Sequence, residues 1–191
     1  MAATNEYCFI KAEDSNTKKR CIMIFPQFSN INIIDRIREK YDPLANNVRP
    51  HITIVFPFQS NISKEELQEY LVASLNGMKS FHLTLEGVIR VYDDSGYYLF
   101  LGVKEGVEKI KELHDKLYEG MLKEYKPNWL NNVEFMPHMT IGNFYNKEEL
   151  DSAYRDVGGI KGRFSTIVDK ISVEIVDKNE DSIIEMEVIL S

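Results

Sequence analysis

Two short stretches of this 191-residue chain carry the same chemistry-bearing pattern. Residues 50–54 read Pro-His-Ile-Thr-Ile, and residues 137–141 read Pro-His-Met-Thr-Ile. Both stretches are apolar and rich in β-branched residues, which is typical of a strand. Residues two apart on a strand project from the same face, about 6.5 Å from each other. Each stretch is therefore expected to present one imidazole and one hydroxyl side by side.

Two such strands facing each other would suit acid–base chemistry on a phosphate. His51 and His138 could take a proton from an attacking water and give one to a departing ribose oxygen, because imidazole has a reference pKa near 6.5. Thr53 and Thr140 would donate hydrogen bonds to the non-bridging oxygens, where negative charge accumulates. Since the reverse reaction uses the same groups, these residues distinguish neither hydrolysis from ligation nor the base from the acid.

The same pair of histidines has two structural alternatives. They could be residues at the edge of a core that cap backbone groups, or they could bind a metal ion. Zinc and non-haem iron sites need a third ligand, and the neighbouring threonines are poor ligands for either metal. We therefore expect neither a metal nor a cofactor.

The remaining two histidines are interpreted as ordinary residues. His82 also lies in a His-x-Thr pattern, but no proline precedes it, and its counterpart in the other half of the chain is Ser165. The apolar residues of its strand alternate with it, which places His82 and Thr84 on the outer face. His114 lies at the edge of an apolar helical stripe, so we expect it at the surface or at the rim of the core.

The rest of the chain predicts alternating strands and helices. Strands are expected at 21–25, 51–58, 81–92, 97–103, around 138–141, at 164–176 and at 183–190. Helices are expected at 31–41, from the capping box Ser63/Glu66 to Gly77, at 106–125 and at 147–156. A turn is expected at 93–96.

The order of these elements suggests an internal duplication. Both His strands are followed by a helix that opens with Lys-Glu-Glu-Leu, at 64–67 and 147–150. Phe81 and Phe164 follow these helices at matching spacing, and a strand and a helix precede each His strand. We therefore expect one bilobal domain over residues 1–191, with repeats at about 20–95 and 97–190. Only near the resulting pseudo-two-fold axis could the two His strands meet.

Composition narrows the function classes. The formal net charge of −7 argues against broad binding to nucleic acid, which needs clustered Lys and Arg. A small nucleotide or an RNA end remains compatible, whereas DNA is not expected. Cys8 and Cys21 show no disulfide or zinc spacing, and no long apolar run is present. We expect a cytoplasmic monomer that does not bind membranes.

At the two His-x-Thr motifs the sequence resembles the two-histidine (2H) phosphoesterase superfamily, which includes 2′-5′ RNA ligases and cyclic nucleotide phosphodiesterases. The resemblance covers about residues 20–190. It implies a duplicated α+β fold of two lobes, each an antiparallel sheet with helices outside, around a central cleft. It also implies catalysis without a metal by His51 and His138, with Thr53 and Thr140 as the phosphate-binding residues.

Two further residues are candidate substrate contacts. Arg49 flanks the first motif and could meet a phosphate, and Tyr145 lies just beyond the second motif strand, where it could stack on a base. Phe56, Phe58 and Phe144 are also near the motifs, but strand parity places Phe56 in the core.

The expected function is therefore hydrolysis of cyclic 2′,3′-type or 2′-5′ phosphodiester bonds. The alternatives are a module that binds RNA ends or nucleotides without turnover, and a 2′-5′ RNA ligase that acts in the reverse direction.

Overall fold

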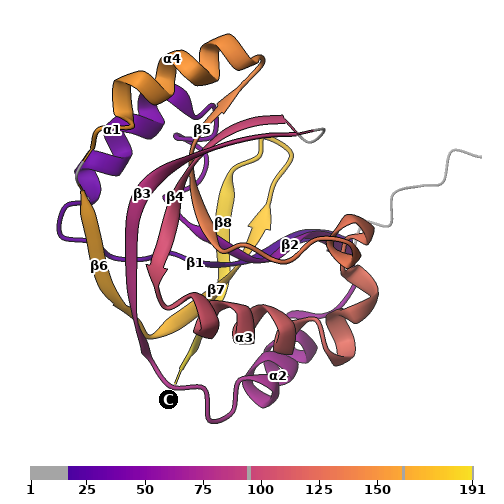
Figure 1. Cartoon of the computed structure of the whole chain (residues 1–191). Coiled ribbons are helices and arrows are strands. Elements are labelled where there is room, and N and C mark those ends of the chain that lie inside the picture. Colours follow the sequence, from indigo (N-terminus) through magenta and orange to yellow (C-terminus); the bar gives the residue numbers. More distant parts are fainter. Residues whose placement is uncertain (1–16, 94–95, 161, 191) are drawn as a thin grey trace, which may run out of the picture.

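The computed structural model describes residues 17–93, 96–160 and 162–190 (Figure 1). In chain order the elements are β1 (Lys18–Ile24), α1 (Ile31–Tyr41), β2 (Ile52–Ser60), α2 (Lys64–Ser74), β3 (Phe81–Asp93), β4 (Gly96–Glu105), α3 (Val107–Leu117), the 3₁₀ helices η1 (Gly120–Tyr125) and η2 (Asn128–Asn131), β5 (His138–Phe144), α4 (Lys147–Val157), β6 (Arg163–Val168), β7 (Lys170–Val176) and β8 (Ser182–Ile189).

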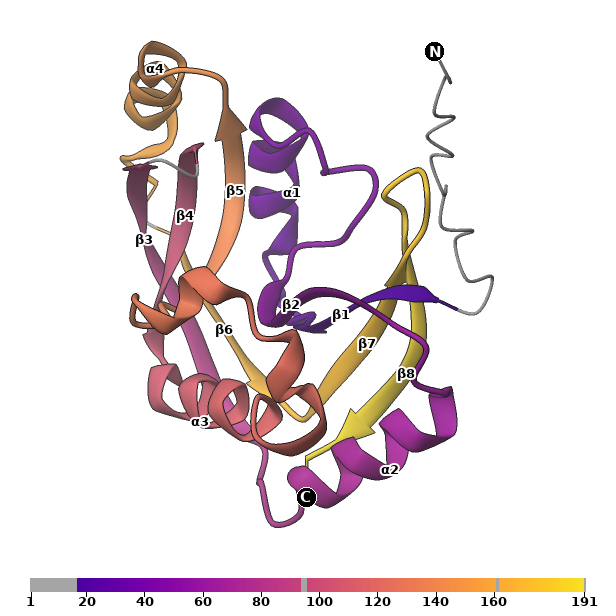
Figure 2. The same ribbon diagram turned by 90° about the vertical axis from the view of Figure 1, so that its right-hand side faces the viewer.

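The strands form two four-stranded sheets whose neighbouring strands are all antiparallel. One sheet has the order β2-β1-β7-β8, and the other has the order β5-β4-β3-β6. Helices cover the sheets, as Figures 1 and 2 show for α2 beside β8 and for α4 beside β3, β4 and β5. The predicted α+β fold with two antiparallel sheets is confirmed.

The helix starts follow from local sequence. The predicted capping box opens α2: the Ser63 hydroxyl accepts from the backbone N–H of Glu66, whose carboxylate accepts from the backbone N–H of Ser63. The Asn146 side chain caps α4 in the same way, by accepting from the N–H of Glu149. None of the described helices is long and apolar enough to cross a membrane.

Two predicted elements were wrong. The helix expected at 106–125 ends at Leu117 and continues after Glu119 as the 3₁₀ helix η1, so Leu122 becomes buried while Met121 is exposed. The strand expected at 164–176 is divided at Asp169 into β6 and β7, which belong to different sheets. The turn expected at 93–96 includes Asp94 and Ser95, which lie outside the described residues.

Corresponding positions in the two sheets relate the halves of the chain. β1 and β2 in one sheet correspond to β4 and β5 in the other, with α1 and α3 as the intervening helices. The position of β3, next to β4, is taken in the other sheet by β7, next to β1. Phe81 on β3 and Phe164 on the edge strand β6 therefore hold different positions in the same sheet, although their sequence spacing matches.

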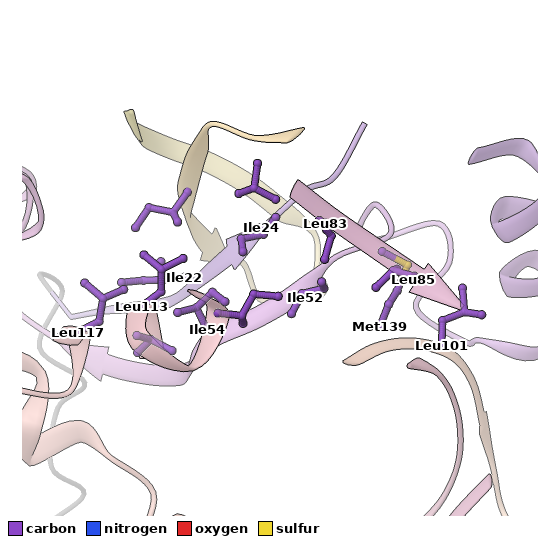
Figure 3. Close-up of a cluster of buried hydrophobic side chains, with 14 of the residues drawn as sticks. Ile22, Ile24, Ile52, Ile54, Leu83, Leu85, Leu101, Leu113, Leu117 and Met139 are labelled. Carbon is purple, nitrogen blue, oxygen red and sulfur yellow. The ribbon is translucent and has the colours of Figure 1, made fainter. Parts of the chain in front are cut away.

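The main core lies between the two sheets and under α3. Figure 3 shows Ile22, Ile24, Ile52 and Ile54 from one sheet close to Leu83, Leu85, Leu101 and Met139 from the other, with Leu113 and Leu117 of α3. All of these side chains are at most 2% exposed. One continuous core thus joins the sheets that carry the two motifs, which is what fixes the motifs relative to each other.

The middle residue of the second motif provides a test of this core. Met139→Ala should lower the free energy of unfolding by about 2–5 kcal/mol, because the Met139 side chain is fully buried and its loss leaves a cavity. Urea denaturation would measure the change. Val72→Ala on the exposed face of α2 is the control and should change the free energy by less than about 0.5 kcal/mol. Equal effects of the two substitutions would contradict a single packed core.

Candidate functional site

The two motif strands are edge strands that lie against each other. β2 ends one sheet and β5 ends the other, and β2 and β5 are in contact. Ile52 and Met139, the middle residues of the motifs, are both fully buried in the shared core. Because side chains alternate along a strand, burial of these residues turns His51, Thr53, His138 and Thr140 to the other face. All four are half-buried.

The two imidazoles are held by the same hydrogen bond. Nδ1 of His51 lies 2.8 Å from the carbonyl oxygen of Arg49, and Nδ1 of His138 lies 2.7 Å from that of Met136. A carbonyl oxygen only accepts, so Nδ1 carries the proton in both rings. Proton exchange is therefore left to Nε2, which in both rings has no hydrogen-bond partner among the described residues.

Ring contacts fix the two imidazoles further. His138 stacks on Phe100 with ring centroids 3.7 Å apart and an interplanar angle of 20°. His51 lies beside Phe25, with centroids 6.0 Å apart and a tilt of 60°. Each imidazole thus has one aromatic neighbour, which lies on the adjacent strand β4 for His138 and directly after the adjacent strand β1 for His51. These contacts orient the rings without a ligand.

Burial lowers the pKa of both histidines. The pKa of His51 falls to about 4, mainly because the ring is buried, and the hydrogen bond to the Arg49 carbonyl opposes this change. Among the smaller effects, the charges of Arg38 and His138 lower the pKa and that of Asp42 raises it. Burial likewise lowers the pKa of His138, and the Met136 carbonyl opposes this change. His138 contributes the smallest of these effects on the pKa of His51.

The hydroxyls of Thr53 and Thr140 have no hydrogen-bond partner among the described residues, so both can bind a ligand. Neither Thr53 nor Thr140 makes a side-chain hydrogen bond within residues 17–93, 96–160 and 162–190. Their partners across the neighbouring strands are Met23 and Phe100, whose side chains offer no hydroxyl or amide. The hydroxyls therefore lie on the same face as the imidazoles without competing protein partners.

A β-bulge follows each motif at the same place. Thr53 pairs with Met23, but the next pair is Val55 with Ile22, so Ile54 is an extra residue. Thr140 pairs with Phe100, and Gly142 with Leu99, so Ile141 is the extra residue in β5. Bulges end simple alternation and re-aim side chains next to functional sites. Strand alternation, from which Phe56 was placed in the core, is therefore interrupted after Thr53. Phe56 nevertheless packs against the core.

Arg38 fixes the loop that leads into the first motif. This arginine of α1 is 2% exposed, and its Nε donates to Asp42 at 2.8 Å. Its Nη1 donates to the carbonyl of Val48 at 2.8 Å, and Nη2 lies 3.4 Å from the carbonyl of Leu44. One guanidinium thus holds three points of the segment between α1 and His51. The apolar spacing of α1 contains this signal, because Arg38 follows the buried Ile34 by four residues.

His114 of α3 and Tyr118, which follows this helix directly, bind the open edge of β2. The expectation of His114 at the surface or at the rim of the core was wrong. His114 is 1% exposed, and its Nδ1 lies 2.8 Å from the carbonyl oxygen of Ile54. The Tyr118 hydroxyl accepts from the backbone N–H of Phe56 at 3.0 Å. The His114 ring also stacks on Phe135, three residues before the second motif histidine, at 3.8 Å. These side chains satisfy edge groups that would otherwise be unpaired.

The second His-x-Thr pattern on β3 is separate from the site. His82 is exposed, as expected. Thr84 is 1% exposed, so its expected place on the outer face was wrong. Its hydroxyl donates to Glu105 at 3.0 Å and lies 3.0 Å from the Ser165 hydroxyl, which accounts for a polar group at a buried position.

The candidate substrate contacts lie in different places. Arg49 is exposed beside the first motif, with its guanidinium 4.4 Å from the centre of the Phe25 ring. Tyr145 is 93% exposed and lines a cavity of about 540 Å³ between α1, α4 and the end of β5. It follows His138 by seven residues of extended chain, which is roughly 20 Å. A mononucleotide at His138 would not reach Tyr145.

The other aromatic candidates are largely enclosed. Phe58 is 4% exposed and lies beside Tyr125. Phe144 is half-buried beside Tyr41. Phe56 is half-buried with its edge toward Trp129 and Phe135. Within the described ranges, no group of three or more His, Cys, Asp or Glu side chains gathers to hold a metal ion.

Comparison with known proteins gives a consistent family. Residues 26–180 match the family model described as the 2′-5′ RNA ligase superfamily. A proposed phosphoesterase of Bacillus licheniformis is 26% identical over 133 residues, which covers 67% of this chain and 72% of that protein. A proposed phosphoesterase of Geobacillus thermodenitrificans is 26% identical over 154 residues, covering 78% and 83%.

Solved structures share the fold. The crystal structure of E. coli LigT with 3′-AMP matches with a TM-score of 0.63 and 15% identity, over 92% of this chain and 99% of that one. LigT with ATP matches with a TM-score of 0.56 and 15% identity, over 93% and 99%. Both comparisons therefore extend over nearly the whole of each chain.

The contact of His114 with β2 predicts a pH-dependent stability. Burial lowers the pKa of His114, so the unfolded chain binds its proton first as the pH falls below about 6.5. The contribution of His114 is complete above that pH and is lost on acidification. His114→Asn keeps a donor for the Ile54 carbonyl but removes the titration. We expect its unfolding free energy to fall less steeply than that of the wild type between pH 7 and 5, as measured by urea denaturation.

His82→Asn is the matched control, since His82 is exposed. It should leave the slope unchanged. A slope that is the same in the wild type and in His114→Asn would contradict the role of His114 at the β2 edge.

Proposed function

Because the chain belongs to the 2′-5′ RNA ligase superfamily, a group of two-histidine phosphoesterases, we propose that it hydrolyses cyclic 2′,3′ or 2′-5′ phosphodiester bonds of small nucleotides or RNA ends. His51 and His138 are the general acid and base, and Thr53 and Thr140 bind the phosphate. The reaction uses no metal ion, and the proposed setting is the cytoplasm.

The observation that carries this proposal is the matched state of the two imidazoles. In both rings Nδ1 is bound to the carbonyl two residues upstream, and Nε2 is left to exchange a proton. A structural histidine uses its nitrogens to satisfy buried groups, as His114 does with the Ile54 carbonyl. Two Nε2 atoms on meeting edge strands, each with a free hydroxyl two residues on, match the requirements of an in-line displacement at phosphorus.

We propose the roles of the two rings from the lowered pKa of His51. His51 has its pKa lowered to about 4, so it is neutral near pH 7 and serves as the base that takes a proton from the attacking water. His138 serves as the acid: its Nε2–H protonates the ribose oxygen as the bond from that oxygen to phosphorus breaks. The products are a nucleoside monophosphate, a protonated His51 and a neutral His138, and exchange with solvent restores both rings.

The comparisons support a small nucleotide as substrate. LigT, which shares the fold, has been solved with 3′-AMP, with ATP and with NADP⁺. Ligation is the second candidate, since the superfamily carries the name of a 2′-5′ RNA ligase and the same two histidines with exchanged roles catalyse the reverse step. A longer RNA product from a cyclic-phosphate end and a free 5′-hydroxyl end would identify ligation.

The acid–base assignment predicts the effect of removing either imidazole. His51→Ala and His138→Ala should each lower kcat/KM for 2′,3′-cyclic nucleotides by about a hundredfold or more, since each removes one proton-transfer group. Hydrolysis would be followed by chromatography of the monophosphate product in the presence of EDTA.

His82→Ala is the control, because His82 lies in the same sequence pattern but is exposed on β3. It should retain wild-type activity. Near-normal hydrolysis by either motif variant would reject the assignment, and activity that disappears in EDTA and returns with zinc would reject the metal-independent mechanism.

The lowered pKa values predict an acidic pH optimum. Activity requires a neutral His51 and a protonated His138 in the free enzyme. The acidic limb of the kcat/KM profile should therefore lie near pH 4, and the alkaline limb should lie below the ordinary histidine value of about 6.5. A profile measured from pH 3.5 to 9 would check this. An optimum above pH 7 would contradict the roles given to the two rings.

A further inference from the structure

A small cavity adjoins the first motif. It has a volume of about 230 Å³ and lies between the end of β1, the start of α1 and the loop that leads to His51. Arg49 and Pro50, the two residues before His51, line it, and so does Phe25, whose ring is the aromatic neighbour of His51. Its size is below the roughly 300–1,000 Å³ of pockets that hold a whole drug-sized ligand. The cavity therefore suits one ring system of a nucleotide.

The walls of this cavity match a flat aromatic ring. Phe25, Phe28 and Ile31 supply apolar surface, and Phe28 and Ile31 also pack against the main core. The Arg49 guanidinium carbon lies 4.4 Å from the centre of the Phe25 ring, over its face. Planar guanidinium groups and aromatic side chains both stack on nucleobases.

One carboxylate in the cavity has no protein partner among the described residues. Asp35 lines the cavity from α1, is half-buried, and makes neither a hydrogen bond nor an ion pair with any residue in those ranges. By contrast, Asp42, further along the same segment, is bound by Arg38. A carboxylate only accepts hydrogen bonds, so Asp35 selects ligands that present donors.

We propose that this cavity binds the base of the substrate nucleotide and favours guanine, an inference that rests on the proposed function for the position of the phosphate. On its Watson–Crick edge, guanine presents two adjacent donors, N1–H and N2–H, which match the two oxygens of the Asp35 carboxylate. Adenine and cytosine present one donor beside a ring-nitrogen acceptor, which would face a carboxylate oxygen unfavourably. Uracil presents one donor between two carbonyl oxygens. Guanine is thus the base that fills both positions.

The place of the cavity agrees with this role. In a nucleoside 2′,3′-cyclic phosphate the ribose alone separates the base from the phosphate. A phosphate at Nε2 of His51 and a base beside Arg49 and Phe25 would occupy neighbouring positions around the same loop. Arg49 then stacks on the base, a more specific role than the phosphate contact expected for it from sequence.

Binding of nucleoside 3′-monophosphates tests the base preference without turnover. Calorimetric titration with guanosine, inosine and adenosine 3′-monophosphates should rank guanosine first, by about tenfold or more over adenosine, as expected for a bidentate contact to a base edge. Inosine lacks the N2 amino group and should fall between them.

Substitution of Asp35 should reverse this ranking. Asp35→Asn presents one donor and one acceptor, which is the complement of the adenine edge, so guanosine 3′-monophosphate should bind about tenfold more weakly and adenosine 3′-monophosphate more tightly. A variant that had merely lost its structure would bind both weakly. Glu39→Gln, one helical turn further along α1 and exposed, is the matched control and should keep the guanine preference.

Hydrolysis of 2′,3′-cyclic GMP and AMP, measured in parallel, separates this inference from the proposed function. Equal binding and equal kcat/KM for the two bases would overturn the guanine site and leave the phosphoesterase function standing. Guanine-selective binding that Asp35→Asn reverses, without hydrolysis of either nucleotide, would support the site and reject the proposed function. An unchanged ranking in Asp35→Asn would also overturn the role of Asp35.

Discussion

The arrangement of the site depends on the burial of two apolar residues in one core. Ile52 and Met139 are the middle residues of the two motifs, and both are fully buried between the sheets. Because a strand alternates its faces, burying the middle residue turns the flanking histidine and threonine the opposite way. The hydrophobic contact between two sheet edges therefore positions four polar side chains that make no direct contribution to that core.

Much of this architecture could be predicted from the sequence, because it is encoded locally. Strand alternation, helix caps and the repeated motif predicted the order of the elements, whereas the two antiparallel sheets were implied by the family resemblance. The failures came from residues whose type disagreed with their position. Arg38 and His114 lie on the buried stripes of their helices, four residues after Ile34 and Ile110, yet polar side chains are usually exposed. Their helical spacing indicates burial, but His114 was expected at the surface or at the rim of the core because of its polar ring, and no burial was expected for Arg38.

Strand pairing could not be predicted in the same way, since it depends on contacts between distant segments. The segment from Phe164 to Val176 has continuous strand character, and nothing in its composition marks Asp169 as the point where the chain leaves one sheet for the other. The two bulges were missed for the same reason: Ile54 and Ile141 are ordinary strand residues, and only the register against β1 and β4 reveals them as extra.

The electrostatic setting of the histidines bears on when the site is charged. Both Nδ1 atoms donate to neutral carbonyls, which favour the imidazolium form but do not outweigh the effect of burial. Burial lowers both pKa values, and the charge of His138 lowers the pKa of His51 slightly further. A phosphate anion between the rings would act in the opposite direction and favour an imidazolium. Under the proposed mechanism, the catalytic proton is therefore held most firmly when the substrate is bound, and substrate binding and protonation of His138 strengthen each other.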